Sequence, residues 1–210
     1  MFFLLFGSSG SGKTLVVDAL RGRVDGLAIH DFDEVGVPPG ADLAWRHRAN
    51  EQWVRRALDY QAESTDLLLA GQTPLGELLA APSALRLEAI SACLLDCDDA
   101  TRMVRLRTRG SEWLSQTGGT LRDHVNWAGW MRGHAADPTS RVEVIRCDAG
   151  WKEMRWSRWS GWRAGDPRWR VRVIDTSASP VEKVTDEFVE WIKAERALVR
   201  SGAHPLAAAS

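Results

Sequence analysis

Residues 4–17, LLFGSSGSGKTLVV, lead from a hydrophobic segment through a glycine-rich loop into a pattern typical of a helix. The loop has the spacing G-x-x-x-x-G-K-[ST] of the Walker A motif, or P-loop. Glycines permit positive φ angles, so backbone N–H groups turn inward, and the start of the helix adds partial positive charge. Lys13 is expected to contact the β- and γ-phosphates of a nucleotide, and the Thr14 hydroxyl a Mg²⁺ ion. The predicted nucleotide-binding residues are Gly7, Ser8, Ser9, Gly10, Ser11, Gly12, Lys13 and Thr14.

Length and composition favour a single α/β domain. The chain has 210 residues, of which 44% are hydrophobic, and a formal net charge of −1, so it has no chain-wide attraction to nucleic acid or anionic membranes. Three cysteines cannot form a complete disulfide framework, which favours a reducing, cytoplasmic location. No segment approaches the ~20 apolar residues of a membrane span, so we expect no membrane contact. The domain is expected to cover residues 1–200, followed by a flexible tail at 201–210.

Hydrophobic runs alternate with helical patterns along the chain, as in βα units around a parallel sheet. Five principal strands are expected at 2–6, 27–30, 66–70, 90–95 and 170–174, with 142–145 as an additional candidate. Helices are expected at 13–21, 42–63, 74–80, 99–109, 121–135 and 180–199.

The second strand ends in Asp31-Phe32-Asp33. Ligands of open α/β sheets lie beyond the carboxyl ends of the strands, so both carboxylates should lie near the phosphates. One can hold Mg²⁺ through water, and the other can accept the proton of an attacking hydroxyl group. The alternative is a solvated acidic turn in which Asp33 caps the next element.

These motifs resemble those of the small P-loop kinases of the nucleoside-monophosphate-kinase-like group, which includes shikimate, gluconate and adenylate kinases and chloramphenicol phosphotransferase. The resemblance implies a three-layer α/β fold with a five-stranded parallel sheet in the order 2-3-1-4-5, and the cofactors ATP and Mg²⁺. It places Asp31 near the metal and Asp33 near the substrate as the base. The helix containing WRHRANEQW is similar to the acceptor helix of the group, which makes Arg48 a candidate substrate clamp, with Arg46 competing for that role.

The third strand ends in Gly71-Gln72, where many P-loop NTPases carry the Walker B aspartate. Glycines stand at this place in shikimate kinase, so Gly71 is expected to approach the acceptor with its backbone and Gln72 to bind it with its amide. A plain turn before the next helix is the alternative. Asp96, at the end of the fourth strand, is not assigned to the metal.

A helical lid is expected at about 109–121, flanked by arginines that resemble those of adenylate-kinase-like enzymes. Phosphoryl transfer spreads negative charge over the transferring oxygens, so positioned positive charge is an effective catalyst. The resemblance adds Arg109, Arg122 and Arg132 to Lys13 and Asp33 as catalytic candidates. The alternative is exposed helical arginines that pair with Asp98, Asp99 or Glu112.

The segment at about 147–169 is an insertion rich in tryptophan and arginine that resembles nothing in these kinases. Rings packed on the domain are the favoured interpretation, ahead of a wall for the acceptor and of nucleic-acid binding. The sequence therefore predicts an ATP-dependent kinase, monomeric or homodimeric, that acts on a hydroxyl group of a small polar metabolite, nucleoside or antibiotic. The rival is a regulatory NTPase that binds nucleic acid through this segment.

Overall fold

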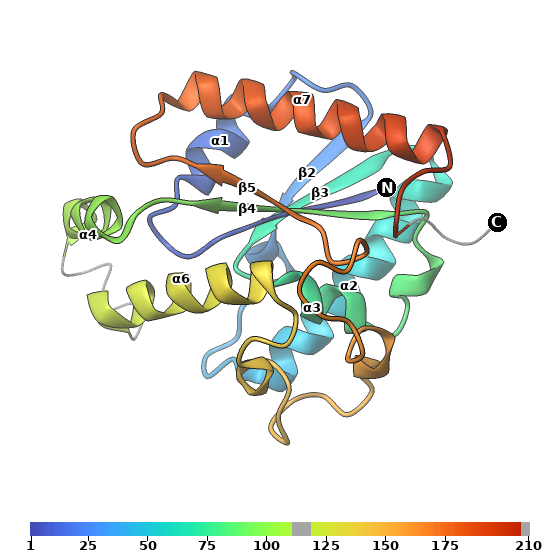
Figure 1. Ribbon diagram of the computed structural model, residues 1–210, viewed down its shortest axis with the longest axis horizontal. Coiled ribbons are helices and arrows are strands. Elements are labelled where there is room, and N and C mark those ends of the chain that lie inside the picture. Colours follow the sequence, from blue (N-terminus) through green and yellow to red (C-terminus); the bar gives the residue numbers. More distant parts are fainter. Residues whose placement is uncertain (111–118, 207–210) are drawn as a thin grey trace.

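A computed structural model describes residues 1–110 and 119–206 of the chain (Figure 1). Its sheet has five parallel strands in the order β2-β3-β1-β4-β5, which confirms the predicted topology. The strands are β1 (Phe2–Phe6), β2 (Leu27–Asp31), β3 (Asp66–Gly71), β4 (Ile90–Asp96) and β5 (Val171–Asp175). Most of the predicted lid, residues 111–118, lies outside the described residues.

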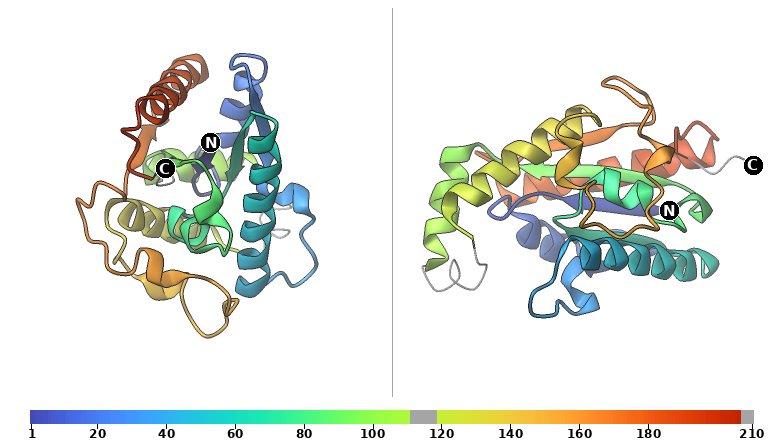
Figure 2. Two further views of the ribbon diagram at one scale, coloured as in Figure 1. Left: turned by 90° about the vertical axis from the view of Figure 1, so that its right-hand side faces the viewer. Right: turned by 90° about the horizontal axis from the view of Figure 1, so that it is seen from below.

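The helices cover both faces of the sheet, which gives three layers (Figures 1 and 2). On one face lie α1 (Lys13–Leu20) and α7 (Val181–Arg200), and on the other lie α2 (Leu43–Ala62), α3 (Leu75–Ala80) and α6 (Leu121–Ala136). The helix α4 (Asp99–Thr108) lies beyond the end of β4. None of the helices in the described ranges is both long and apolar enough to cross a membrane.

The central strand β1 is buried on both faces, as expected for a parallel sheet covered by helices. Its side chains alternate between two hydrophobic cores. Phe2, Leu4 and Phe6 face the core under α2, α3 and α6, whereas Phe3 and Leu5 face the core under α1 and α7. The P-loop therefore follows a rigid strand.

The candidate strand at 142–145 is wrong, because the segment forms a short 3-10 helix over Val142–Val144. It follows Arg141, which has a φ of 43°, and the carbonyl of Arg141 accepts a hydrogen bond from the Trp130 indole at 3.1 Å. Ile145 is fully buried in the core that also contains Trp130 and Trp159. The apolar pattern that suggested a strand reflects this packing.

The tryptophan-rich segment packs on the domain, in agreement with the favoured interpretation. Trp159 and Trp169 are 2% and 6% exposed, and their ring centroids lie 5.2 Å apart. The indole N–H of Trp169 donates to the carbonyls of His134 and Ala135 at 3.1 Å, which joins the segment to α6. These two rings are therefore unavailable for stacking on nucleotide bases.

The tail beyond Arg200 does not project freely over its described part. His204 is 6% exposed, and its Nε2 lies 2.9 Å from the Ser91 hydroxyl and 3.3 Å from a carboxylate oxygen of Glu195. Residues 201–206 are therefore attached to β4 and α7, unlike the flexible tail expected from their small side chains, and residues 207–210 lie outside the described residues.

Replacing Trp159 with Phe should lower the free energy of unfolding by ~1–3 kcal/mol, because the buried carbonyl of Gly76 loses the indole N–H that lies 2.9 Å away. Urea denaturation followed by circular dichroism measures this loss. Trp156→Phe is the control, since the Trp156 indole makes no hydrogen bond within the described residues, and its stability should fall by less than that of Trp159→Phe. Equal losses in the two variants would contradict a specific role for the Trp159 hydrogen bond.

Candidate active site

The P-loop forms a tight cradle between β1 and α1. Gly10 and Gly12 have φ angles of 81° and 91°, in the left-handed region that favours glycine. A Cβ atom on Gly7 would lie 2.3 Å from the carbonyl oxygen of Leu95, so this position excludes any side chain. The loop therefore leads its backbone directly to the N-terminus of α1, where an anion is favoured.

Lys13 folds back over this cradle. Its Nζ donates hydrogen bonds to the carbonyls of Gly7 and Ser8 at 2.5 and 3.3 Å. Burial, followed by repulsion from Arg102, lowers the pKa of Lys13 to about 8. A phosphate group that enters the cradle would raise the pKa of Lys13 again, because it places negative charge next to the ammonium group.

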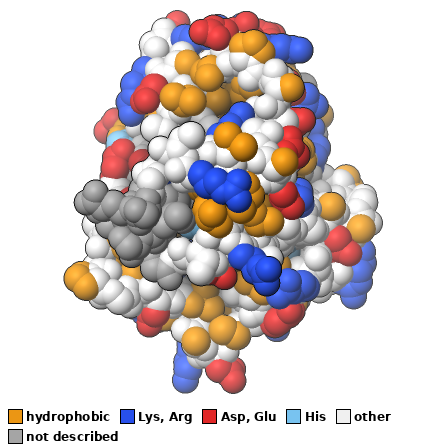
Figure 3. All heavy atoms as spheres, turned by 90° about the vertical axis from the view of Figure 1, so that its left-hand side faces the viewer, with side chains coloured by type: hydrophobic (Ala, Val, Ile, Leu, Met, Phe, Trp, Pro, Cys, Tyr) orange, Lys and Arg blue, Asp and Glu red, His pale blue; other side chains and the backbone are white. Residues whose placement is uncertain are grey.

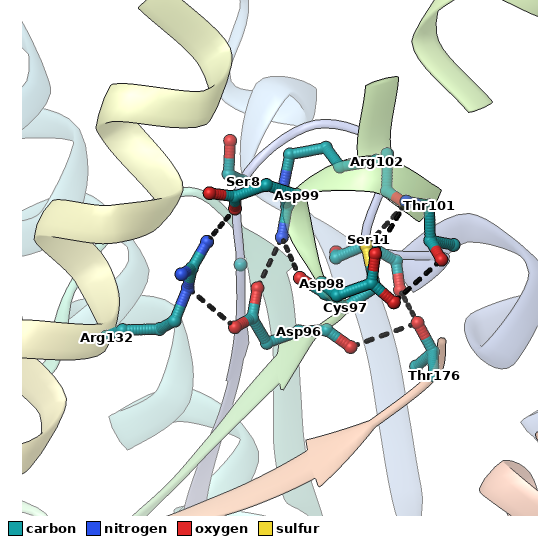
Figure 4. A network of polar contacts seen from close by, with 12 residues as sticks. Ser8, Ser11, Asp96, Cys97, Asp98, Asp99, Thr101, Arg102, Arg132 and Thr176 are labelled. Carbon is teal, nitrogen blue, oxygen red and sulfur yellow. Dashed lines mark hydrogen bonds and ion pairs between the residues drawn. The ribbon is translucent and has the colours of Figure 1, made fainter. Parts of the chain in front are cut away.

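Two arginines of α4 contact backbone carbonyls of the loop. The fully buried Arg102 donates to the carbonyl of Ser9 at 2.6 Å and pairs with Asp96 (Figure 4). Arg105 donates to the carbonyl of Gly10 at 3.2 Å and to the hydroxyl of Thr176 at 2.8 Å. Both guanidinium groups donate to loop carbonyls and so support the cradle, and Arg105 also lines the cavity on the side of α7.

The second-strand carboxylates lie at the same cavity as Lys13. This cavity has a volume of about 460 Å³ and is lined by the P-loop and by Asp31 and Asp33. Asp31, not Asp33, is the helix cap, because its side chain accepts the backbone N–H of Asp33 at 2.9 Å. Burial and the charge of Asp31 raise the pKa of Asp33, while Lys13 opposes them. Asp33 is thus a carboxylate with increased proton affinity at the exposed edge of the cavity wall.

The end of β3 contributes Gly71 to the lining of the cavity. The carbonyl of Gly71 accepts the N–H of Gly7 at 3.2 Å, and a Cβ atom on Gly71 would lie 2.7 Å from that of Phe32. Gln72 and Thr73 follow it in the lining. The hydroxyl of Thr73 is buried and has no hydrogen-bond partner within the described residues, so a polar group is available here that the sequence did not point to.

On α2 the structure reverses the order of the two arginine candidates. Arg46 lines the cavity, while Arg48 is exposed and lies outside the lining. The reason is the phase of the helix: Arg46 lies on the same side as the buried Asn50 and Trp53, whereas Arg48 is turned to solvent. Arg46 also forms an ion pair with the buried Glu77 of α3.

The three arginines flanking the lid have different surroundings. Arg109 lines the cavity beside the P-loop. Arg122 is exposed and does not line it. Arg132 forms ion pairs with Asp96, at 2.9 Å, and with Asp99 (Figure 4). Arg122 and Arg132 are therefore not placed as catalytic residues, and the alternative of pairing with Asp99 is confirmed for Arg132.

A second cavity of about 260 Å³ adjoins the first on the side of α7. It shares Gly10, Gly12, Thr14 and Arg109 with the first, and it adds an apolar wall: Leu15, Val16, Val181 and Val184. Figure 3 views this end of the molecule, where Lys and Arg side chains lie among hydrophobic ones. The site thus consists of a phosphate cradle with a polar cavity on one side and a more apolar cavity on the other.

Solved structures of kinases share this fold. A gluconokinase from Sinorhizobium meliloti 1021 aligns with a TM-score of 0.55 at 14% identity, over 96% of this chain and 97% of its own. A sugar kinase from Janibacter sp. HTCC2649 aligns with a TM-score of 0.51 at 15% identity, over 94% of this chain and 96% of its own. No protein-family model matches the chain, and no curated protein matches it significantly. The predicted P-loop kinase fold is therefore confirmed by structure at low sequence identity.

Proposed function

We propose that this chain is an ATP-dependent phosphotransferase that moves the γ-phosphoryl group to a hydroxyl group of a small molecule. The observation that carries the proposal is the shared cavity, in which Lys13 and the P-loop face Asp31 and Asp33. The fold of a gluconokinase and a sugar kinase supports the same class of reaction. Hydrolysis alone would not require a cavity with its own polar lining next to the phosphates.

The two adjoining cavities provide a place for each part of ATP. The polyphosphate lies in the cradle, where the amides of the loop and Lys13 donate hydrogen bonds to it. The adenine base occupies the second cavity, where Val181 and Leu15 offer apolar surface. Arg109 lines both cavities and lies where it can contact the phosphates.

The residues at the cradle fit a Mg²⁺ ion that arrives with the nucleotide. No group of three His, Cys, Asp or Glu side chains in the described residues can hold a metal by itself. Mg²⁺ commonly uses one or two protein groups together with phosphate oxygens and water. Thr14 and Asp31 line the cavity and would supply those groups. When bound, the ion would neutralise charge on the phosphates.

The transfer itself follows from the position of Asp33. The acceptor hydroxyl approaches from the side of Asp33 and Gln72, and its oxygen forms a bond to the γ-phosphorus while the bond to the ADP oxygen breaks. The hydroxyl proton passes to the carboxylate of Asp33, whose raised pKa suits a proton acceptor. Lys13 stabilises the charge on the transferring group.

The test is whether ATP consumption depends on an alcohol. ADP release should stay near background with Mg²⁺-ATP alone and rise when the correct hydroxyl compound is added from a metabolite, nucleoside and antibiotic panel. The product should carry the phosphate, which mass spectrometry detects. Stimulation of ATP hydrolysis by RNA or DNA, without a phosphorylated product, would contradict the proposal.

The affinity for a nonhydrolysable ATP analogue should fall as the pH rises through 8. The pKa of Lys13 in the free protein is lowered to about 8, and phosphates bind its charged form, so above that pH binding must take up a proton. Isothermal calorimetry between pH 7 and 10 should show a dissociation constant that is level below about pH 8 and rises toward ~10-fold per pH unit above it. Lys13→Arg, which keeps its charge over this range, is the control, and an equal slope in both proteins would exclude Lys13 as the cause.

A further inference from the structure

We call the part of the first cavity next to Asp33, Arg46 and Gln72 the acceptor side. The charge of Arg46 on this side is already neutralised by Glu77. The Nε of Arg46 donates to both carboxylate oxygens of Glu77 at 3.0 Å, and its Nη2 donates to one of them at 2.5 Å. The Glu77 side chain is fully buried. Burial alone would raise the pKa of Glu77, but Arg46 and then His47 outweigh it and lower the pKa, which keeps the carboxylate ionised.

Asn50 and His47 are the other polar neighbours of Glu77. Asn50 donates its Nδ2 to Glu77 at 3.1 Å. The Nδ1 of His47 accepts the backbone N–H of Trp151 at 3.1 Å, so the ring proton lies on Nε2, which faces Glu77 at 3.6 Å. Within the cluster of Arg46, Glu77, Asn50 and His47, the guanidinium of Arg46 is thus paired with the carboxylate of Glu77.

The remaining charges on the acceptor side are negative. Asp31 and Asp33 are ionisable carboxylates of the lining, and Arg46 is the cationic residue of α2 that reaches it. Lys13 and Arg109 lie at the phosphate cradle, where the nucleotide takes up their charge. Among the described residues, a carboxylate or phosphate on the acceptor would thus meet no uncompensated positive charge on this side of the cavity, and burying an unpaired charge is costly.

The wall of the acceptor side is aromatic and held in place. Phe32, Trp45 and Trp127 line the cavity. Trp127 stacks on Trp130 with ring centroids 4.7 Å apart and planes 8° from parallel, and Phe32 contacts Trp45 edge-on at 6.0 Å. A flat or apolar surface on the acceptor fits this wall.

Arg46 still offers hydrogen-bond donors to a neutral molecule. Its Nη1 makes no hydrogen bond within the described residues, and its Cζ lies 5.5 Å from the ring centroid of Trp127. Gln72 adds an amide group to the same lining. A guanidinium fixed by Glu77 can donate to a hydroxyl or carbonyl oxygen with little loss of side-chain entropy.

We propose, on the premise of the phosphotransferase function above, that the acceptor is an uncharged ring-bearing alcohol, not a carboxylate or a phosphate ester. Its ring lies along Trp45 and Trp127, its polar groups accept hydrogen bonds from Arg46 and Gln72, and its reacting hydroxyl faces Asp33. Glu77 is a positioning residue, because it acts on the acceptor through Arg46.

Matched pairs of compounds test this proposal. With a saturating nonhydrolysable ATP analogue and Mg²⁺, dissociation constants are measured for thymidine and its monophosphate, and for phenyl glucoside and phenyl glucuronide, within a wider set of such pairs. In each pair of compounds for which binding is detected, the uncharged compound should bind at least ~10-fold more tightly than the anionic one, which corresponds to about 1.4 kcal/mol. Tighter binding of the anionic members, or no binding by any uncharged ring alcohol, would overturn the proposal. Binding of the ATP analogue alone is measured first, so failure of the proposed function is recognised separately.

Glu77→Gln tests the role of charge neutralisation. The variant leaves Arg46 as an uncompensated cation, so the preference for uncharged compounds should shrink by ~10-fold while ATP-analogue affinity stays unchanged. Arg46→Gln should weaken uncharged ligands without improving anionic ones, and Arg48→Gln, on the exposed side of the same helix, is the control without effect. A folded Glu77→Gln protein with the wild-type preference would exclude this role of Glu77. If that variant does not fold, the comparison of Arg46→Gln with Arg48→Gln decides whether Arg46 contacts the acceptor.

Discussion

Replacing Lys13 with Ala should reduce kcat/KM for ATP by ~10³-fold or more, the largest effect expected for any single side chain in this protein. The ammonium group is a half-buried cation at the cradle, 2.5 Å from the carbonyl of Gly7 and within reach of phosphates bound there. Its loss removes a charge-assisted donor both from bound ATP and from the transferring group. Nucleotide affinity should therefore fall as well as turnover.

Binding and steady-state kinetics separate these two losses. Calorimetry with a nonhydrolysable ATP analogue measures affinity, and a coupled assay for ADP measures turnover. Lys193→Ala is the matched control, because it removes the same charge from an exposed position on α7, where Lys193 pairs with Glu190. A Lys13→Ala protein with unchanged melting temperature and wild-type ATP affinity would show that the cradle does not bind a polyphosphate.

The fold was predictable because its signals are local. Strands β1 to β4 are short, mostly apolar runs that end in glycine or a polar residue or directly precede one, and β1 has side chains buried on both faces, as a central parallel strand requires. The motif at Gly7–Thr14 specifies its own geometry through glycines that only a loop of this shape needs. The glycine and polar residues at the ends of these runs also indicated the approximate boundaries of the strands and helices.

The errors concern contacts between residues distant in the sequence. Arg102 and Arg105 support the P-loop from α4, and no pattern within α4 indicates that their partners are carbonyls of Ser9 and Gly10. Arg132 was expected near the phosphates, but Asp96 on β4 lies within reach of its guanidinium and pairs with it. Such pairings depend on how the elements pack, which residue spacing does not encode.

The choice between Arg46 and Arg48 was accessible from the sequence. Arg46 precedes Asn50, Trp53 and Ala57 by four, seven and eleven residues, which places all four on one side of a helix. Arg48 falls on the opposite side. Extending the helical phase of the buried residues back to the start of α2 would have indicated Arg46.

Asp33→Asn should lower kcat by ~10²-fold or more and leave the affinity for an ATP analogue within about threefold of wild type. The amide keeps the size of the side chain but cannot accept the proton of the acceptor hydroxyl. Glu34→Gln is the neighbouring control, because Glu34 is occupied by His30 and by the backbone N–H of Asp31 and does not line the cavity. Single-turnover measurements with the identified acceptor would isolate the chemical step, and an unchanged rate in Asp33→Asn would remove Asp33 as the base.

The pH dependence of the rate tests the same role. Because burial and Asp31 raise the pKa of Asp33, the wild-type rate should begin to fall with decreasing pH at a pH above the ordinary aspartate pKa, and Asp33→Asn should lack this acid-side decrease.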